Sequence, residues 1–227
     1  MSQIDPIMQV THTQEKKAYE YYAKAILETL LPEKYHGLYM GECPDIRTPD
    51  GRGIEVTRAF YPGEGEALGM LNTYANRPKS AIKPKTMEAI EKKGILLGED
   101  EGRIVTAHLQ CGHFISSSVL EHAYQSKIEK YEHYKEMKSV DLFIYEPPGI
   151  GLDECFIIDF FETIDEKNPY ESIMVLSDVE DPNNPTQYCP LLYCYDTQAK
   201  KYKKLIMSII ERDRCKKATQ AYVGYMQ

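Results

Sequence analysis

The order of elements predicted from the sequence favours an α/β fold in which a mixed central sheet is flanked by helices. An apolar stripe at helical spacing opens the chain, three short strand-like segments follow, and a second long helix precedes a strongly apolar strand. The predicted helices and strands cover, in chain order, residues 13–30, 37–40, 43–47, 54–60, 116–137 and 140–145. A helix that joins the third and fourth strands implies a crossover connection, so we expect these two strands to be parallel.

The first helix is predicted from an apolar stripe and from its two ends. Thr11 or Thr13 is a suitable N-cap, and Pro32 ends the helix. The residues at helical spacing are Tyr19, Tyr22, Ala23, Ile26, Leu27 and Leu30. The second helix has serines at positions 116–118 as possible caps, with Glu121 three residues after Ser118, as a capping box requires.

The strands are predicted from β-branched residues and turn residues. A Pro-Asp-Gly turn, residues 49–51, separates the segment 43–47 from Ile54, Val56 and Thr57. The run 140–145 (VDLFIY) is apolar almost throughout, as is typical of a strand that is buried on both faces.

The remaining segments are assigned from composition. Residues 154–164 are a strand or a buried helical turn, the Asp-, Asn- and Pro-rich stretch 177–189 is a loop, 191–195 is a last strand, and 205–222 is a C-terminal helix. We therefore expect one domain over residues 1–227, with a core at about 13–146, an insertion at about 61–115 and a C-terminal extension at 147–227.

Composition places the chain among ordinary soluble globular proteins. It has 227 residues, of which 42% are hydrophobic and 27% charged, and it lacks an apolar run of membrane-spanning length or a secretory signal pattern. We expect a cytoplasmic protein with reduced cysteines and no membrane partner. The net charge of −8 excludes a globally basic nucleic-acid-binding protein. Residues 77–93 carry six basic against two acidic side chains, and 200–217 carry eight against two, so either patch is a solvated face or a phosphate contact.

Two carboxylates define the candidate chemistry. Asp45 and Glu55 lie on adjacent predicted strands that a tight turn joins, so they can converge on one divalent cation. Strand alternation places Glu55 and Thr57 on one face and Ile54, Val56 and Arg58 on the other. A carboxylate in mid-strand under a covering helix is costly unless it is paired or binds a metal. The alternative is that Glu55 faces solvent and Asp45 only stabilises a turn.

Pro44-Asp45, followed after a gap by Glu55-Val56-Thr57, resembles the motif of the PD-(D/E)XK, or restriction-endonuclease-like, nuclease superfamily. The resemblance covers roughly residues 13–146. It implies a restriction-endonuclease-like core that hydrolyses phosphodiester bonds in nucleic acid, with DNA as the expected substrate and Mg²⁺ or Mn²⁺ as the cofactor. It also implies metal ligation by Asp45, Glu55 and the Val56 carbonyl, with Glu20 and Glu42 as accessory residues, and a possible homodimer.

Thr57 occupies the place of the family's lysine and cannot carry its positive charge. Some members of the superfamily supply this lysine from the following helix, which here offers Lys127 first and Lys130 second, with Gln125 as a polar alternate. Two other readings stay open. The chain is a nuclease-like binding module for nucleic acid or protein that has lost its chemistry, or an unrelated α+β protein that contacts only proteins. His108, Cys111 and His113 lack the second ligand pair of a structural zinc site and fit a strand and turn better.

Overall fold

The computed structural model describes residues 12–60, 67, 69–70, 73–93, 95–109, 117–134, 136–146, 152–181 and 184–224. The chain divides into two compact units. One comprises residues 60–115 with 1–9, and the other comprises 10–59 with 116–227.

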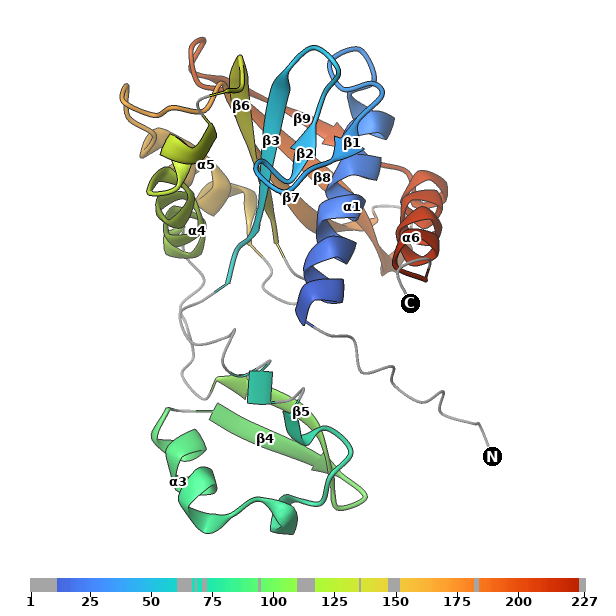
Figure 1. The fold of residues 1–227 in the computed structure, drawn as a ribbon. Helices are drawn as coiled ribbons and strands as arrows, with labels where there is room; N and C mark the ends of the chain where they lie inside the picture. Colours follow the sequence, from blue (N-terminus) through green and yellow to red (C-terminus); the bar gives the residue numbers. More distant parts are fainter. Residues whose placement is uncertain are drawn as a thin grey trace. The chain divides into compact units, whose positions relative to one another are not determined.

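The larger unit is built on a seven-stranded mixed sheet in the order β1-β2-β3-β6-β7-β8-β9 (Figure 1). β6 is parallel to both of its neighbours, β3 and β7, and all other pairs are antiparallel. The strands are β1 (Tyr39–Met40), β2 (Ile46–Arg47), β3 (Arg52–Arg58), β6 (Ser139–Tyr145), β7 (Ser172–Asp181), β8 (Asn184–Asp196) and β9 (Lys201–Ile206).

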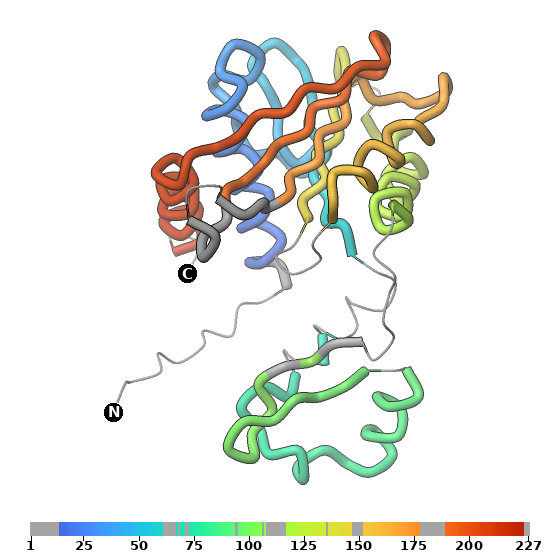
Figure 2. Tube along the Cα trace, turned by 180° about the vertical axis from the view of Figure 1, so that it is seen from behind, coloured from blue at the N-terminus to red at the C-terminus, as the bar shows by residue number. Residues whose placement is uncertain are grey.

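Two helices cover each face of this sheet (Figures 1 and 2). α1 (His12–Leu30) and α6 (Ile209–Gly224) pack on one face, and α4 (Ser118–Ile128) and α5 (Glu154–Glu162) pack on the other. The main apolar core lies under α1 and α6. It includes Ile26, Leu27, Ile54, Val56, Phe143, Met174 and Leu192. On the other face the core is aromatic: the Tyr124 and Phe160 rings lie 5.9 Å apart, and Phe161 stacks on Tyr195 at 4.8 Å.

The smaller unit has its own core. A two-stranded antiparallel sheet, β4 (Ile95–Asp100) and β5 (Arg103–Leu109), accompanies α3 (Pro84–Lys92), which begins with proline at a position that needs no N–H donor. Ile82, Ile90, Ile95, Leu97 and Ile104 are buried together. Most of the basic side chains of residues 77–93, such as Lys85 and Lys92, are exposed.

The predicted elements up to β6 agree with the structure in order and kind, including the parallel pairing of β3 with β6. The second helix is shorter than predicted: α4 ends at Ile128, and a 3-10 turn, η2 (Tyr131–Tyr134), follows it. The predicted capping box does not form, because the N-cap is Ser117 and its hydroxyl bonds the Glu121 carboxylate at 2.7 Å. In the described ranges, every helix is too short or too polar to traverse a lipid bilayer.

Three predictions for the C-terminal part need correction. The expected loop at 177–189 is wrong, because β7 and β8 run through most of it as a long antiparallel hairpin. The segment 191–195, predicted as the last strand, belongs to the C-terminal half of β8, and β9 follows it as the last strand. Of residues 154–164, left open between strand and helix, Glu154–Glu162 form α5. Since β7, β8, β9 and α6 complete the same sheet and its covering layer, no boundary separates 13–146 from 147–227. Cys111 and His113 lie outside the described residues.

Candidate functional site

Asp45 and Glu55 meet because of the register between β2 and β3. Ile46 pairs with Ile54 and Arg47 with Gly53, so the next step outward places Asp45 opposite Glu55. The Asp45 Oδ2 atom accepts the Val56 backbone N–H at 2.9 Å, a bond that fixes the carboxylate against β3. Both acids are buried, with Asp45 2% and Glu55 5% exposed, so neither lies on the solvent-facing edge that the alternative reading requires.

The side chains of β3 alternate between the two faces of the sheet, as predicted from the sequence. Ile54 and Val56 belong to the core under α1, and Arg58 also faces α1, where it pairs with Glu15 and lies 4.7 Å over the Tyr19 ring. Glu55 points to the opposite face and meets Lys127 of α4.

Lys127 is the lysine of α4 that reaches the acids. Its side chain is 13% exposed, and its ammonium forms a direct ion pair with Glu55 Oε1. Gln125 and Lys130, the alternates, are exposed. Tyr134 of η2 also hydrogen-bonds Glu55. Glu55 is therefore held from two sides.

A third buried carboxylate comes from α1. Glu20 is fully buried, and its Oε1 and Oε2 lie 2.9 Å from Lys16 Nζ and 3.3 Å from Lys17 Nζ. Lys16 also reaches Asp45 Oδ1 at 3.2 Å, so its ammonium bridges Glu20 and Asp45. Neither oxygen of Glu20 has a hydrogen-bond partner of good geometry among the described residues, although both ion pairs are close.

Burial and mutual repulsion shift the titration of these acids. The pKa of Glu20 is raised by burial first and then by the negative charge of Asp45, against the pull of Lys16. Burial and the Asp45 charge likewise raise the pKa of Glu55, against Lys127 and Tyr134. Although burial opposes it, the pairing with Glu20 and Asp45 raises the pKa of Lys16. Burial and mutual repulsion therefore oppose the ionised forms of Glu20 and Glu55, and the lysine ion pairs favour them.

The other predicted site residues lie nearby but make weaker contributions. Glu42 is almost fully exposed and reaches Lys17 at 3.6 Å. Thr57, two residues after Glu55, is half-buried. The Val56 side chain packs into the core while its N–H binds Asp45.

Four residues that contact or face the acids were not predicted from the sequence: Lys16, Lys17, Tyr134 and Tyr170. Lys16 and Lys17 stand four and three residues before Glu20, the spacing of helical ion pairs, and this signal was available in the sequence. Tyr170 is buried, and its hydroxyl has no hydrogen-bond partner within the described ranges. Its pKa is raised by burial first and then by the charge of Glu55.

The donor set suits a hard divalent cation, because all three acids offer oxygens. The orphaned oxygens of Glu20 and the raised pKa values of Glu20 and Glu55 are features that such a cation would relieve. However, the described residues contain no group of three or more acidic, His or Cys side chains already arranged around one ion position. The Lys16 ammonium lies between Glu20 and Asp45, and a cation that bound both acids would have to displace it.

No family model, curated protein or solved structure matches the chain.

Proposed function

We propose that the chain is a metal-dependent nuclease that hydrolyses phosphodiester bonds in nucleic acid, with DNA as the expected substrate and Mg²⁺ or Mn²⁺ as the cofactor. The observation that supports this proposal is the meeting of three buried carboxylates, Glu20, Asp45 and Glu55, with the Lys127 ammonium on Glu55. Buried carboxylates with raised pKa values, such as Glu20 and Glu55, are more typical of functional sites than of structural cores.

In this proposal Asp45 and Glu55 hold the ion, with Glu20 as a third ligand and the Val56 carbonyl as a further oxygen donor. A bound divalent cation supplies positive charge that acidifies a water molecule and neutralises the phosphoryl group. The chain's own groups orient these ligands: the Val56 N–H fixes Asp45, and Tyr134 and Lys127 fix Glu55.

Lys127 takes the role of the missing motif lysine. Thr57 carries no charge, whereas the Lys127 ammonium lies on the Glu55 carboxylate from the neighbouring helix. From there it would donate a hydrogen bond to the attacking water and place positive charge near the phosphate.

Cleavage of supercoiled plasmid with Mn²⁺ tests the proposal. Asp45→Asn and Glu55→Gln should each abolish nicking, and Glu162→Gln, an exposed carboxylate at the end of α5, should cut like wild type. Circular dichroism of each variant separates loss of chemistry from loss of fold. Equal nicking by wild type, Asp45→Asn and Glu55→Gln would assign any cleavage to a contaminant and reject the enzyme.

A binding module without chemistry is the second candidate, and the Lys16 bridge favours it. An ammonium that already neutralises Glu20 and Asp45 gives a stable site without any metal. Calorimetry with Mn²⁺ distinguishes the two candidates. Heat of binding that disappears in Asp45→Asn supports the nuclease, whereas no metal binding together with a DNA gel shift supports the binding module.

A further inference from the structure

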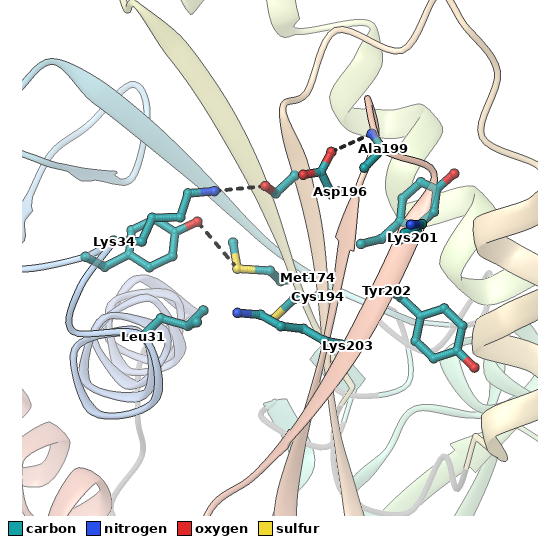
Figure 3. A pocket seen from close by; sticks show the side chains of 12 residues that line it. Leu31, Lys34, Met174, Cys194, Asp196, Ala199, Lys201, Tyr202 and Lys203 are labelled. Atoms are coloured by element: carbon teal, nitrogen blue, oxygen red, sulfur yellow. Dashed lines mark hydrogen bonds between the residues drawn. The ribbon is translucent and has the colours of Figure 1, made fainter.

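Several partly buried cations of the larger unit are paired with structural carboxylates. At the cavity that Figure 3 shows, Lys34 lies 3.3 Å from the fully buried Asp141, and its Nζ bonds Ser172 Oγ at 2.8 Å. Arginine is rarely buried without such a partner. Three half-buried arginines follow this rule: Arg52 pairs with Asp141 and Glu171, Arg58 with Glu15, and Arg212 with Asp213.

Arg47 of β2 is also half-buried, but it has a different kind of partner. Its Nη2 donates a hydrogen bond to the Cys43 carbonyl oxygen at 2.6 Å, and its Nε is buried without an acceptor among the described residues. Within the same part of the chain, no carboxylate forms an ion pair with it. A carbonyl oxygen accepts a hydrogen bond without neutralising the guanidinium, which stays protonated at every relevant pH. Arg47 therefore keeps a positive charge that an anion can use.

The turn before β2 fixes the Arg47 side chain. The Gly41 backbone N–H bonds the Asp45 carbonyl at 2.8 Å, which closes the turn. A Cβ atom at Gly41 would lie 2.5 Å from the Pro44 carbonyl oxygen and 3.2 Å from Arg47 Nε, so glycine leaves the room that the arginine occupies. The guanidinium is thus held in place by packing and by the Cys43 bond, and a preorganised group loses less entropy when it binds a ligand.

Arg47 lies next to the acid cluster. Side chains two residues apart on a strand share a face at a separation of roughly 7 Å, which makes Arg47 a neighbour of Asp45. Partial desolvation raises the pKa of Cys43, an exposed thiol, and the negative charges of Glu55 and Asp45 raise it further. The positive charges of Arg47 and Lys127 oppose this rise. Cys43 therefore marks a surface at which both acids and both cations are close.

The anion that suits this position best is a phosphate of a nucleic-acid strand. The planar guanidinium fork matches phosphate oxygens, and hydrogen bonds between charged groups are stronger than neutral ones. A strand with one phosphate at Asp45 and Glu55 carries further phosphates on both sides of it. One of these can reach an arginine that lies a short step away along β2, whereas an isolated carboxylate of a protein offers no such continuity.

We infer that Arg47 is a substrate-binding residue whose guanidinium holds a backbone phosphate of nucleic acid beside the acid cluster. The inference rests on the nucleic-acid substrate of the proposed function, and it applies to the nuclease and to the binding module alike. Phosphate contacts fix the position of a protein on the strand and carry no base information. Arg47 therefore contributes affinity that is independent of base sequence, and it takes no part in proton transfer.

Fluorescence anisotropy of the full chain with a short labelled DNA duplex in EDTA tests this inference. Arg47→Gln should weaken binding about tenfold and lower the slope of log K against log salt by about 1, because one phosphate contact is lost. Arg47→Lys keeps the charge and should keep the wild-type slope. The matched control is Arg214→Gln, which removes an exposed arginine of α6 and should bind like wild type. Circular dichroism checks the fold of each variant.

Alkylation of cysteine locates the contact in the wild-type chain. The exposed Cys43 thiol belongs to the residue whose carbonyl bonds Arg47, so bound DNA should slow its reaction with a maleimide. Cys155 of α5 is exposed as well, and its rate should be the same with and without DNA. Mass spectrometry of the labelled peptides measures both rates in one sample.

Absence of DNA binding by the wild type would overturn the inference, as would an unchanged salt slope in Arg47→Gln or an equal loss in Arg214→Gln. Arg47→Lys with the slope of Arg47→Gln would assign the arginine to the turn alone and reject it as a phosphate ligand. If Arg47→Gln does not fold, the alkylation rates decide, and equal slowing of Cys43 and Cys155 rejects the contact. Cleavage requires Mn²⁺ and plays no part in these measurements, so their failure leaves the nuclease proposal to the nicking assay with Asp45→Asn.

Discussion

Replacing Lys127 with methionine removes one charge from the cluster and keeps the length and apolar stem of the side chain. In the wild type, Lys127 is 13% exposed and pairs with Glu55, which is 5% exposed. Removal of one partner from a buried ion pair leaves the other charge uncompensated and costs about 3–5 kcal/mol. Glu55 keeps its Tyr134 hydrogen bond and can take up a proton, so we expect a loss near the lower limit, about 3 kcal/mol at pH 7.5.

The sign of the pH dependence follows from the direction of the pKa shift. Burial and the Asp45 charge already raise the pKa of Glu55 above its unfolded value, and Lys127→Met raises it further. A group with a raised folded pKa favours the folded state below its unfolded pKa, and this contribution is lost as the pH rises through the folded pKa. The variant should therefore be close to wild type near pH 4.5 and fall increasingly behind between that pH and neutrality.

Urea denaturation at pH 5 and pH 7.5, followed by far-UV circular dichroism, measures both quantities. Lys130→Met is the matched control, because it removes an exposed lysine three residues away and should change stability by less than about 0.5 kcal/mol. A double variant with Glu55→Gln should recover stability at pH 7.5, as expected for coupled partners. A deficit that is equal at both pH values, or as large in Lys130→Met, would refute the buried-pair reasoning.

Three further perturbations probe other parts of the larger unit. Glu20→Gln should weaken Mn²⁺ binding about tenfold by calorimetry, and unchanged affinity would exclude Glu20 as a ligand. The same substitution should change the free energy of unfolding by less than about 1 kcal/mol, because it also removes the repulsion between Glu20 and Asp45. Leu27→Ala, in the core under α1, should cost about 2–5 kcal/mol in urea denaturation, and Ile206→Ala, 67% exposed, less than about 0.5 kcal/mol; similar losses would contradict the core assignment. Tyr35→Phe removes a hydrogen bond to a buried carboxylate and should cost about 1.5–3 kcal/mol, and a variant as stable as wild type would mean that Asp141 does not depend on it.

The first half of the larger unit, as far as β6, could be predicted from the sequence because its signals are local. The stripe of α1, the turn before β3 and the apolar run of β6 each lie within a window of a few residues, and the crossover rule then gives their pairing. The C-terminal strands could not be predicted in this way. The hairpin of β7 and β8 crosses an Asp-, Asn- and Pro-rich stretch in which Pro190 pairs with Asp178, so strand pairing overrides residue preference.

β9 was missed for a related reason. Its sequence, KYKKLI, contains three lysines and is largely exposed, as is common for a strand at the edge of a sheet. A polar edge strand has no periodic apolar signal of its own. β9 can be assigned only from its pairing with β8, and the local sequence does not show that pairing.

In the candidate site, too, the contact that depends on nearby residues could be predicted from the sequence, and the contacts between distant residues could not. The encounter of Asp45 with Glu55 follows from one turn and one register, and the sequence predicts it. Lys127 is 72 residues from Glu55 along the chain and comes into place through the crossover, and the resemblance to a known family supplied it. Nothing local predicts that Lys16 bridges to Asp45, because that contact depends on the angle at which α1 crosses the sheet edge.

The lysines around the acids affect both the stability of the larger unit without metal and its affinity for a metal ion. Three ammonium groups, from Lys16, Lys17 and Lys127, neutralise three buried carboxylates, so the larger unit does not need a cation to fold. A divalent ion would compete with Lys16 for Glu20 and Asp45, and the displaced Lys16 side chain, which is 39% exposed, could turn its ammonium out to solvent. The free energy of metal binding is then the difference between two states: the acids bound to the ion, and the same acids paired with Lys16. Such a site binds its ion more weakly than the number of carboxylates alone suggests, and Lys16→Met, which removes the competitor, should bind Mn²⁺ more tightly than wild type.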